Sequence, residues 1–185
     1  MAIQANAIKM NTYMRAKNGL PVTPRDYPIA ASQVLHRGDP VVWSSGKVTK
    51  IIAPTGTSTT TLVGSGTLMV GIVAQALTVD SSSVSTDGRA VTTVPVVPIN
   101  QVEMMLGGIG AAGANASKVY TDYTLGTSYA LACVTNPSTS IWTWAVSTTT
   151  TNANMNLIIL SEESTTTETY PYMWFDVLRA AQVGA

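Results

Sequence analysis

The sequence predicts an all-β protein: a small β-barrel or sandwich domain with an extended N-terminal arm and additional C-terminal β strands. Short runs rich in Val, Ile, Thr and aromatic residues recur along the chain, and Gly- or Asp-containing turns separate them. None of the runs after residue 117 shows a clear helical period. We divide the chain into an arm (1–33), a β domain (34–106) and further strands (107–185), which form part of the same domain or a second β lobe.

The N-terminal arm lacks any sustained helical or strand period, and Pro21, Pro24 and Pro28 interrupt its second half. Stretched out, a segment of about 30 residues reaches on the order of 100 Å. One reading is a disordered tail, as is common at termini. The aromatic and methionine side chains favour the other, an arm that orders on a partner.

The segment 34–106 contains three candidate hairpin turns. Each turn has a Gly that supplies a positive φ between two strand-like runs. The turns are Ser44-Ser45-Gly46-Lys47, Gly64-Ser65-Gly66 and Asp87-Gly88. At the end of the segment two alternatives stay open: a short helix with Asn100 as N-cap and Glu103 as its capping-box partner, or a strand that simply continues. The small-residue stretch 107–114 is predicted to be a loop.

Five further strands are predicted after residue 117. They are Lys118–Tyr120, Ser128–Val134, Ile141–Val146, Met155–Leu160 and Tyr172–Leu178. Alternate residues of a strand share a face, so Trp142 lies with Trp144, and Tyr172 with Trp174. Aromatic residues and Met anchor protein interfaces as well as cores. The candidate partner-binding residues are Tyr13, Met14, Tyr27, Trp142, Trp144, Trp174 and Phe175.

Composition limits the function classes. The chain has 10 basic and 10 acidic residues, only 11% of it is charged, and nothing resembles the Lys/Arg cluster that a nucleic acid needs. A hydrophobic fraction of 45% with so few charges indicates apolar surface buried against other subunits. The single Cys133 excludes an internal disulfide, and we find no signal peptide or membrane-spanning run. We expect a protein made in the cytoplasm that does not bind membranes.

Catalytic and metal-binding patterns are sparse. His36 is the only His, no Gly-x-Ser-x-Gly motif accompanies it, and the carboxylates are scattered. Glu162 and Glu163 are adjacent, so on a strand they point to opposite faces. No Cys pair, His pair or Asp-rich loop indicates a metal. We therefore expect no enzymatic activity, metal or cofactor; a hydrolase that uses His36 is a lesser alternative.

The segment Leu35–Trp43 contains an Arg-Gly-Asp triplet of the kind that adhesion ligands display. The alternative is a turn that feeds a strand, because Asp39 can bond nearby backbone and Pro40 starts a strand without an N–H partner. We favour the turn. The adhesive alternative requires the triplet to be exposed at a loop tip.

Residues 35–100 resemble the small β domain of tailed-bacteriophage head decoration, or cement, proteins. The residues that carry the resemblance are, in order, Arg37-Gly38-Asp39-Pro40-Val41-Val42, Gly46-Lys47-Val48, Val70-Gly71-Ile72-Val73-Ala74-Gln75-Ala76 and Val94-Pro95-Val96-Val97. The resemblance implies a β-tulip-like domain, and the chain departs from it by the extra residues after 106.

The same resemblance implies a function. It describes a non-enzymatic virion component, made in the host cytoplasm, that sits on the outside of the capsid, often as a homotrimer, and clamps neighbouring subunits of the major capsid protein. Contacts through the arm, apolar burial and strand addition would then carry binding. The alternative from the same class of particle is a receptor-binding or tail-fibre module.

Overall fold

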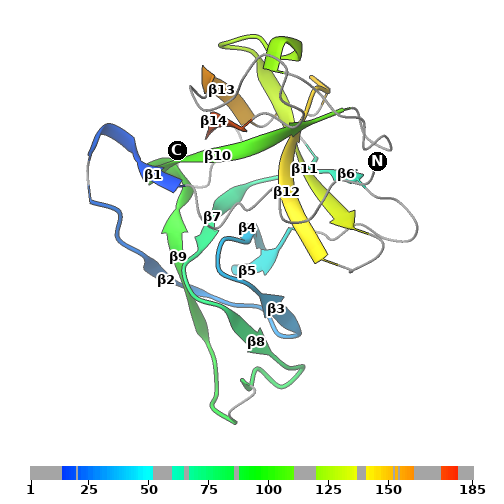
Figure 1. Ribbon diagram of the computed structural model, residues 1–185. Helices are drawn as coiled ribbons and strands as arrows, with labels where there is room; N and C mark the ends of the chain where they lie inside the picture. The colour runs from blue at the N-terminus through cyan, green and yellow to red at the C-terminus, as the bar shows by residue number, and fades with distance from the viewer. Residues whose placement is uncertain are drawn as a thin grey trace. The chain divides into compact units, whose positions relative to one another are not determined.

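The computed structural model describes residues 14–19, 21–51, 60–64, 67–85, 88–110, 120–136, 141–151, 153, 155–160 and 172–178. These residues form strands and short 3-10 turns without an α-helix, which confirms the predicted all-β, sandwich-like class (Figure 1). The described residues divide into two compact units. The first unit lies within Met1–Arg15, Ile52–Thr67 and Glu103–Ala181, and the second within Ala16–Ile51 and Leu68–Val102.

The second unit is built on a five-stranded sheet with the order β2-β9-β7-β4-β5. Its strands are β2 (Arg25–Pro28), β4 (Pro40–Ser44), β5 (Lys47–Lys50), β7 (Met69–Val73) and β9 (Thr93–Pro98). An isolated bridge also joins Ile29, just after β2, to Val48 of β5. A separate ribbon pairs β3 (Gln33–Leu35) with β8 (Leu77–Val79).

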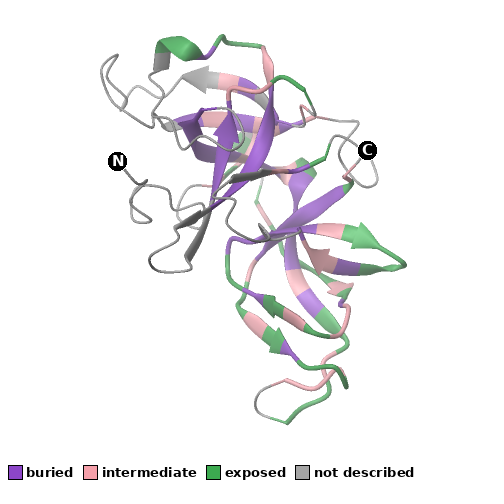
Figure 2. Ribbon diagram, turned by 90° about the vertical axis from the view of Figure 1, so that its right-hand side faces the viewer, coloured by how far each residue is buried: buried purple, intermediate pink, exposed green. Residues whose placement is uncertain are grey.

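Alternation explains how these strands fold. One side chain in two points to a common core, which includes Ile29, Leu35, Val41, Val48, Val70, Val73, Val79, Val94 and Val96. Figure 2 shows the alternation as bands of purple, pink and green along the strands. The predicted turn between β4 and β5 is confirmed, since Ser45 (φ 50°) and Gly46 (φ 77°) both have the positive φ of a tight hairpin turn.

The first unit is built on a seven-stranded sheet with the main order β1-β10-β12-β11-β13-β14. Strand β10 also pairs with β14, and β6 pairs with β11. The strands are β1 (Met14–Ala16), β6 (Thr60–Leu62), β10 (Val102–Ile109), β11 (Ser128–Asn136), β12 (Ile141–Ser147), β13 (Met155–Leu160) and β14 (Tyr172–Val177). The β10–β12 pair is parallel, whereas β11 and β12 are antiparallel.

Tyr123 secures the parallel β10–β12 pair. Its ring is buried, and its hydroxyl lies 2.9 Å from the carbonyl oxygens of Ile109 and Val146, one on each strand. Gly108 makes room for the ring, because an added Cβ would lie 2.7 Å from Tyr123 Cε2. Burial raises the pKa of the Tyr123 phenol well above its ordinary value of 10.0.

Three local predictions are corrected by these strands. Residues 107–109 are not a loop but the end of β10, where glycine is needed for close packing. The segment after Pro98 is a 3-10 turn, η3 (Ile99–Gln101), which has no side-chain cap and is followed at once by β10. Neither alternative holds as stated, because the strand is interrupted and the helix capped by Asn100 does not form. Tyr120 begins another 3-10 turn, η4 (Tyr120–Asp122), rather than ending a strand.

The predicted boundaries also change. Residues 25–28 form β2 and pair with β9, so this part of the predicted arm belongs to the second unit. Residues 65 and 66 of the predicted turn lie outside the described residues, but the strands on either side do not form the predicted hairpin, because β6 pairs with β11 while β7 pairs with β4 and β9. Of the predicted β domain, the described residues 60–64, 67 and 103–106 therefore belong to the first unit. A local turn signal indicates a change of direction but not which strand is the partner.

Candidate functional site: two interaction surfaces

The Arg-Gly-Asp triplet is a folded turn in front of β4. Gly38 has φ 93° and donates from its N–H to the Val73 carbonyl at 2.9 Å. The Asp39 N–H donates to the His36 carbonyl at 3.0 Å, and Asp39 Oδ2 accepts from the His36 N–H at 2.8 Å. The Asp39 carboxylate thus accepts a hydrogen bond from the backbone of His36, which precedes it in the chain, and not from the backbone of a residue that follows it. The prediction of a turn is confirmed.

The Asp39 carboxylate is bound by other groups of its own chain. Asp39 is only 9% exposed, and Lys50 Nζ lies 2.8 Å from its Oδ2. The His36 imidazole is the more distant neighbour, with Nδ1 at 3.4 Å from the same oxygen. An adhesion ligand has to present its Asp to a receptor. The position of Asp39 does not meet the condition set for the adhesive alternative.

Two of the predicted partner-binding residues are core residues instead. Trp144 is 3% exposed in β12, and Phe175 is 0% exposed in β14. Burial within the chain's own sheet removes both rings from any partner. Trp142 pairs through its backbone with Thr135, but its side chain lies outside the described residues, as does all of Tyr13.

Tyr27 belongs to the first candidate surface, which we call the aromatic rim and define as Tyr27, Trp43 and Leu68. The rings of Tyr27 and Trp43 meet edge to face, with centroids 6.4 Å apart. The Trp43 N–H donates to the Leu68 carbonyl at 3.1 Å. Trp43 is 38% exposed and Leu68 44%. Large apolar side chains gathered at the surface mark candidate interaction sites.

The aromatic rim continues the core of the second unit outward. Tyr27 comes two residues before core residue Ile29, and Trp43 two residues after core residue Val41. Because alternate residues share a face, these rings point to the same side as the core. Tyr27 packs directly against it. The rim is therefore held by the fold and presents an apolar surface without a rearrangement.

Trp174 belongs to the second candidate surface, which we call the arginine clip and define as Arg15, Glu103 and Trp174. Arg15 Nε lies 2.5 Å from Glu103 Oε2, and its guanidinium stands 4.3 Å above the centroid of the Trp174 ring. Both contacts are partly exposed, so each contributes up to about 1 kcal/mol. Met14 is the half-buried neighbour of Arg15 on β1.

Sequence reasoning missed Arg15, Trp43, Leu68 and Glu103. Trp43 was identified only as a strand residue, although its place beside a hairpin turn is a signal for an exposed ring. Arg15 and Glu103 are 88 positions apart, and only the pairing of β1 with β10 brings them together. No local pattern signals that contact.

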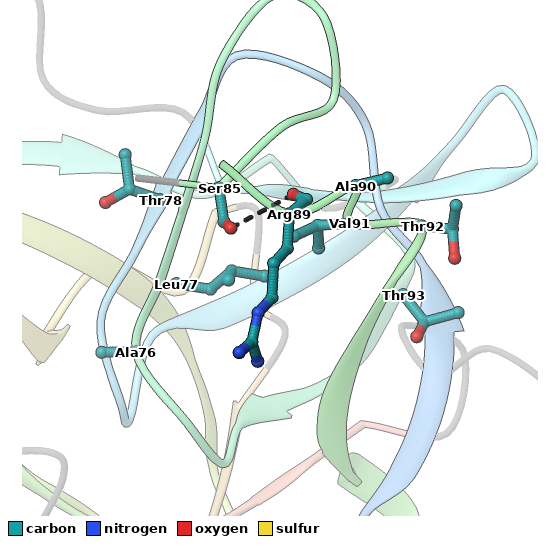
Figure 3. Close-up of a pocket in the computed structure, with 9 residues that line it drawn as sticks. All are labelled: Ala76, Leu77, Thr78, Ser85, Arg89, Ala90, Val91, Thr92 and Thr93. Carbon is teal, nitrogen blue, oxygen red and sulfur yellow. Dashed lines mark hydrogen bonds between the residues drawn. The ribbon is translucent and has the colours of Figure 1, made fainter. Parts of the chain in front are cut away.

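A hollow of about 460 Å³ lies beside β8 and the start of β9 in the second unit. Figure 3 shows the Arg89 side chain running past Leu77, and the Ser85 hydroxyl donating to the Arg89 carbonyl at 3.1 Å. The described lining consists of hydroxyl, methyl and aliphatic groups with this one guanidinium. Among these described groups no acid and base stand together for catalysis.

Within the described part of the chain, no cluster of three His, Cys, Asp or Glu residues has the arrangement of a metal site. No helix found there is both long and apolar enough to cross a membrane. No model of a known protein family matches the chain, and no curated protein or solved structure compared with it does so either.

Proposed function

We propose that this chain is a non-enzymatic structural virion protein that binds the outside of a bacteriophage capsid. In this role it cements neighbouring subunits of the major capsid protein and assembles with itself, as a homotrimer. The observation that carries the proposal is the position of the four motifs that resemble those of head decoration proteins. All four motifs fall in the second unit, at the turn before β4, at the β4–β5 turn, on β7 and on β9.

The structural roles of these residues support the proposal. Gly38 and Asp39 bond to β7 through Val73, whose N–H donates to the Asp39 carbonyl at 2.9 Å. Gly71 allows β7 to approach β9 closely, since an added Cβ would lie 2.1 Å from the Val97 carbonyl oxygen. The motifs therefore occupy positions that define one unit, as motifs inherited with a domain would.

The aromatic rim is the surface that we assign to the coat protein. A rim of this chemistry binds by apolar burial, so its affinity should depend little on salt. The chain's net charge of zero agrees with an interaction that charge does not drive. The predicted contacts of the N-terminal residues 1–13 fall outside the described residues.

The first test is the copy number of the chain in gradient-purified particles, measured by quantitative mass spectrometry against the major coat protein. A ratio comparable to the coat protein supports the proposal. A handful of copies per particle points instead to a tail or fibre component. Absence from particles overturns both.

The second test measures rebinding of variants to particles from which the chain has been stripped. We expect Trp43→Ala to lower the affinity by at least tenfold, as for an interface anchor worth more than about 1.4 kcal/mol. Leu125→Ala is the matched control, because Leu125 is 58% exposed but belongs to the first unit. Equal binding by the two variants would remove the rim from the interface.

A further inference from the structure

We propose that β1 is exchanged between copies of this chain, so that Met14–Ala16 of one copy pairs with β10 of a second copy and closes the arginine clip there. In the structure β1 pairs with β10 of its own chain. The inference rests on the self-association contained in the proposed function, and it names the strand and the side chains that would join the copies.

The contacts of the Arg15 side chain hold strand β1 in place more than the burial of its apolar side chains does. It has three residues, β10 is its neighbour in the sheet order, and Met14 and Ala16 are only half-buried. Its Arg15 contributes the clip, in which the side chain remains 41% exposed. A strand that buries so little apolar surface can leave the sheet at low cost.

After β1 the chain forms a 3-10 turn, η2 (Lys17–Gly19), and then enters a segment with two prolines before β2. β1 lies in the seven-stranded sheet, whereas the next strand, β2, lies in the five-stranded sheet. Between them Gly19 has φ 69° with open space around it, and Pro21 and Pro24 follow. Proline and the residue before it favour extended backbone. When η2 unwinds and the segment is fully extended, the eight residues 17–24 span roughly 25–30 Å.

A second copy is the occupant that fits this edge. Exchange reproduces the same backbone pairing, the same Arg15–Glu103 ion pair and the same stacking on Trp174, so no new surface has to evolve. Exchange of an identical element is a low-cost route by which identical chains form dimers. When each copy donates one strand and accepts one, the copies close into a dimer or a ring, which includes the proposed trimer.

Charge inversion tests the exchange. Arg15→Glu places two carboxylates in the clip, and Glu103→Arg places two guanidinium groups there, so each variant alone repels its own clip. In a mixture the two variants are complementary only across copies. We expect native mass spectrometry of the co-refolded full-length variants to show mixed oligomers enriched roughly tenfold over the statistical proportion, as replacing repulsion by ion pairs predicts.

Two controls define the outcome. The double variant Arg15→Glu/Glu103→Arg restores the ion pair whichever chain supplies β1, so its unfolding temperature should be higher than that of either single variant. This result would show that the single variants fold but lack the ion pair of the arginine clip. Mixed oligomers in statistical proportion, or a monomeric wild-type protein, would overturn the exchange. No capsid takes part in this experiment, so its failure leaves the copy-number and rebinding tests unaffected, and their failure leaves this one unaffected.

Discussion

Gly71→Ala is the substitution for which the structure predicts the sharpest loss of stability. Gly71 lies on β7 opposite Pro98 of β9. An added Cβ would stand 2.1 Å from the Val97 carbonyl oxygen and 2.6 Å from Val96 Cγ1. To restore a separation of 3.0 Å, the carbonyl would have to retreat by roughly 0.9 Å. Backbone in a paired strand cannot yield as a flexible side chain does, so we expect a loss of about 3 kcal/mol, the upper part of the usual overpacking range.

Urea unfolding measures this loss. Trp43 is the sole Trp in the ranges that form the second unit, and its fluorescence is isolated by subtracting a Trp43→Phe reference. Gly64→Ala is a steric control, because its Cβ meets only Thr67 Oγ1, at 3.6 Å. Gly64 lies in the first unit, so its unfolding is followed by calorimetry of the whole chain and not by the Trp43 signal. The control should change stability by less than about 1 kcal/mol. If Gly71→Ala also lost less than about 1 kcal/mol, the close β7–β9 approach would be refuted.

Three further predictions concern buried groups. Tyr123→Phe removes the hydroxyl between β10 and β12 and should cost about 1–2 kcal/mol. Because the folded state raises the Tyr123 pKa, the free energy of unfolding should fall as pH rises above 10, by up to about 1.4 kcal/mol per pH unit. In denaturant titrations at pH 9–11, the free energy of unfolding of the Phe variant should depend less steeply on pH. Asp39→Asn should destabilise the second unit by about 1–3 kcal/mol, seen in the same Trp43 signal, since Lys50 loses its ionic partner; an unchanged midpoint would contradict the assigned ion pair. Phe175→Ala should cost about 3–5 kcal/mol in calorimetry if the ring is core, and near zero if it belongs to a free surface.

The two candidate surfaces differ in the chemistry of the contacts that they can make. The aromatic rim is apolar and part of the second unit, whereas the arginine clip is ionic and part of the first. Raised salt should therefore weaken contacts made through the clip more than contacts made through the rim. A salt series applied to self-association and to particle rebinding would compare the two directly.

Local chemistry was sufficient to place many elements from the sequence by itself. β-Branched alternation located β4, β5, β7 and β11–β14, and the positive φ of Gly46 and Gly38 follows from turn residues that act over a few positions. The role of Asp39 as a turn residue was predictable for the same reason. Its bond to Lys50 was less so, since Lys50 reaches it across the β4–β5 hairpin.

Only the tertiary structure decided which strands are partners and which aromatic rings are buried. Trp43 and Trp144 both lie in apolar strands. Trp43 lies next to the β4–β5 turn and is partly exposed, whereas Trp144 pairs with Cys133 of β11 and is buried. Gly107 and Gly108 read locally as a loop, but a ring from Tyr123 fills the space beside Gly108 within the β10–β12 pair. Strand pairing joins residues far apart in sequence, so its energy depends on contacts that no short window of sequence contains.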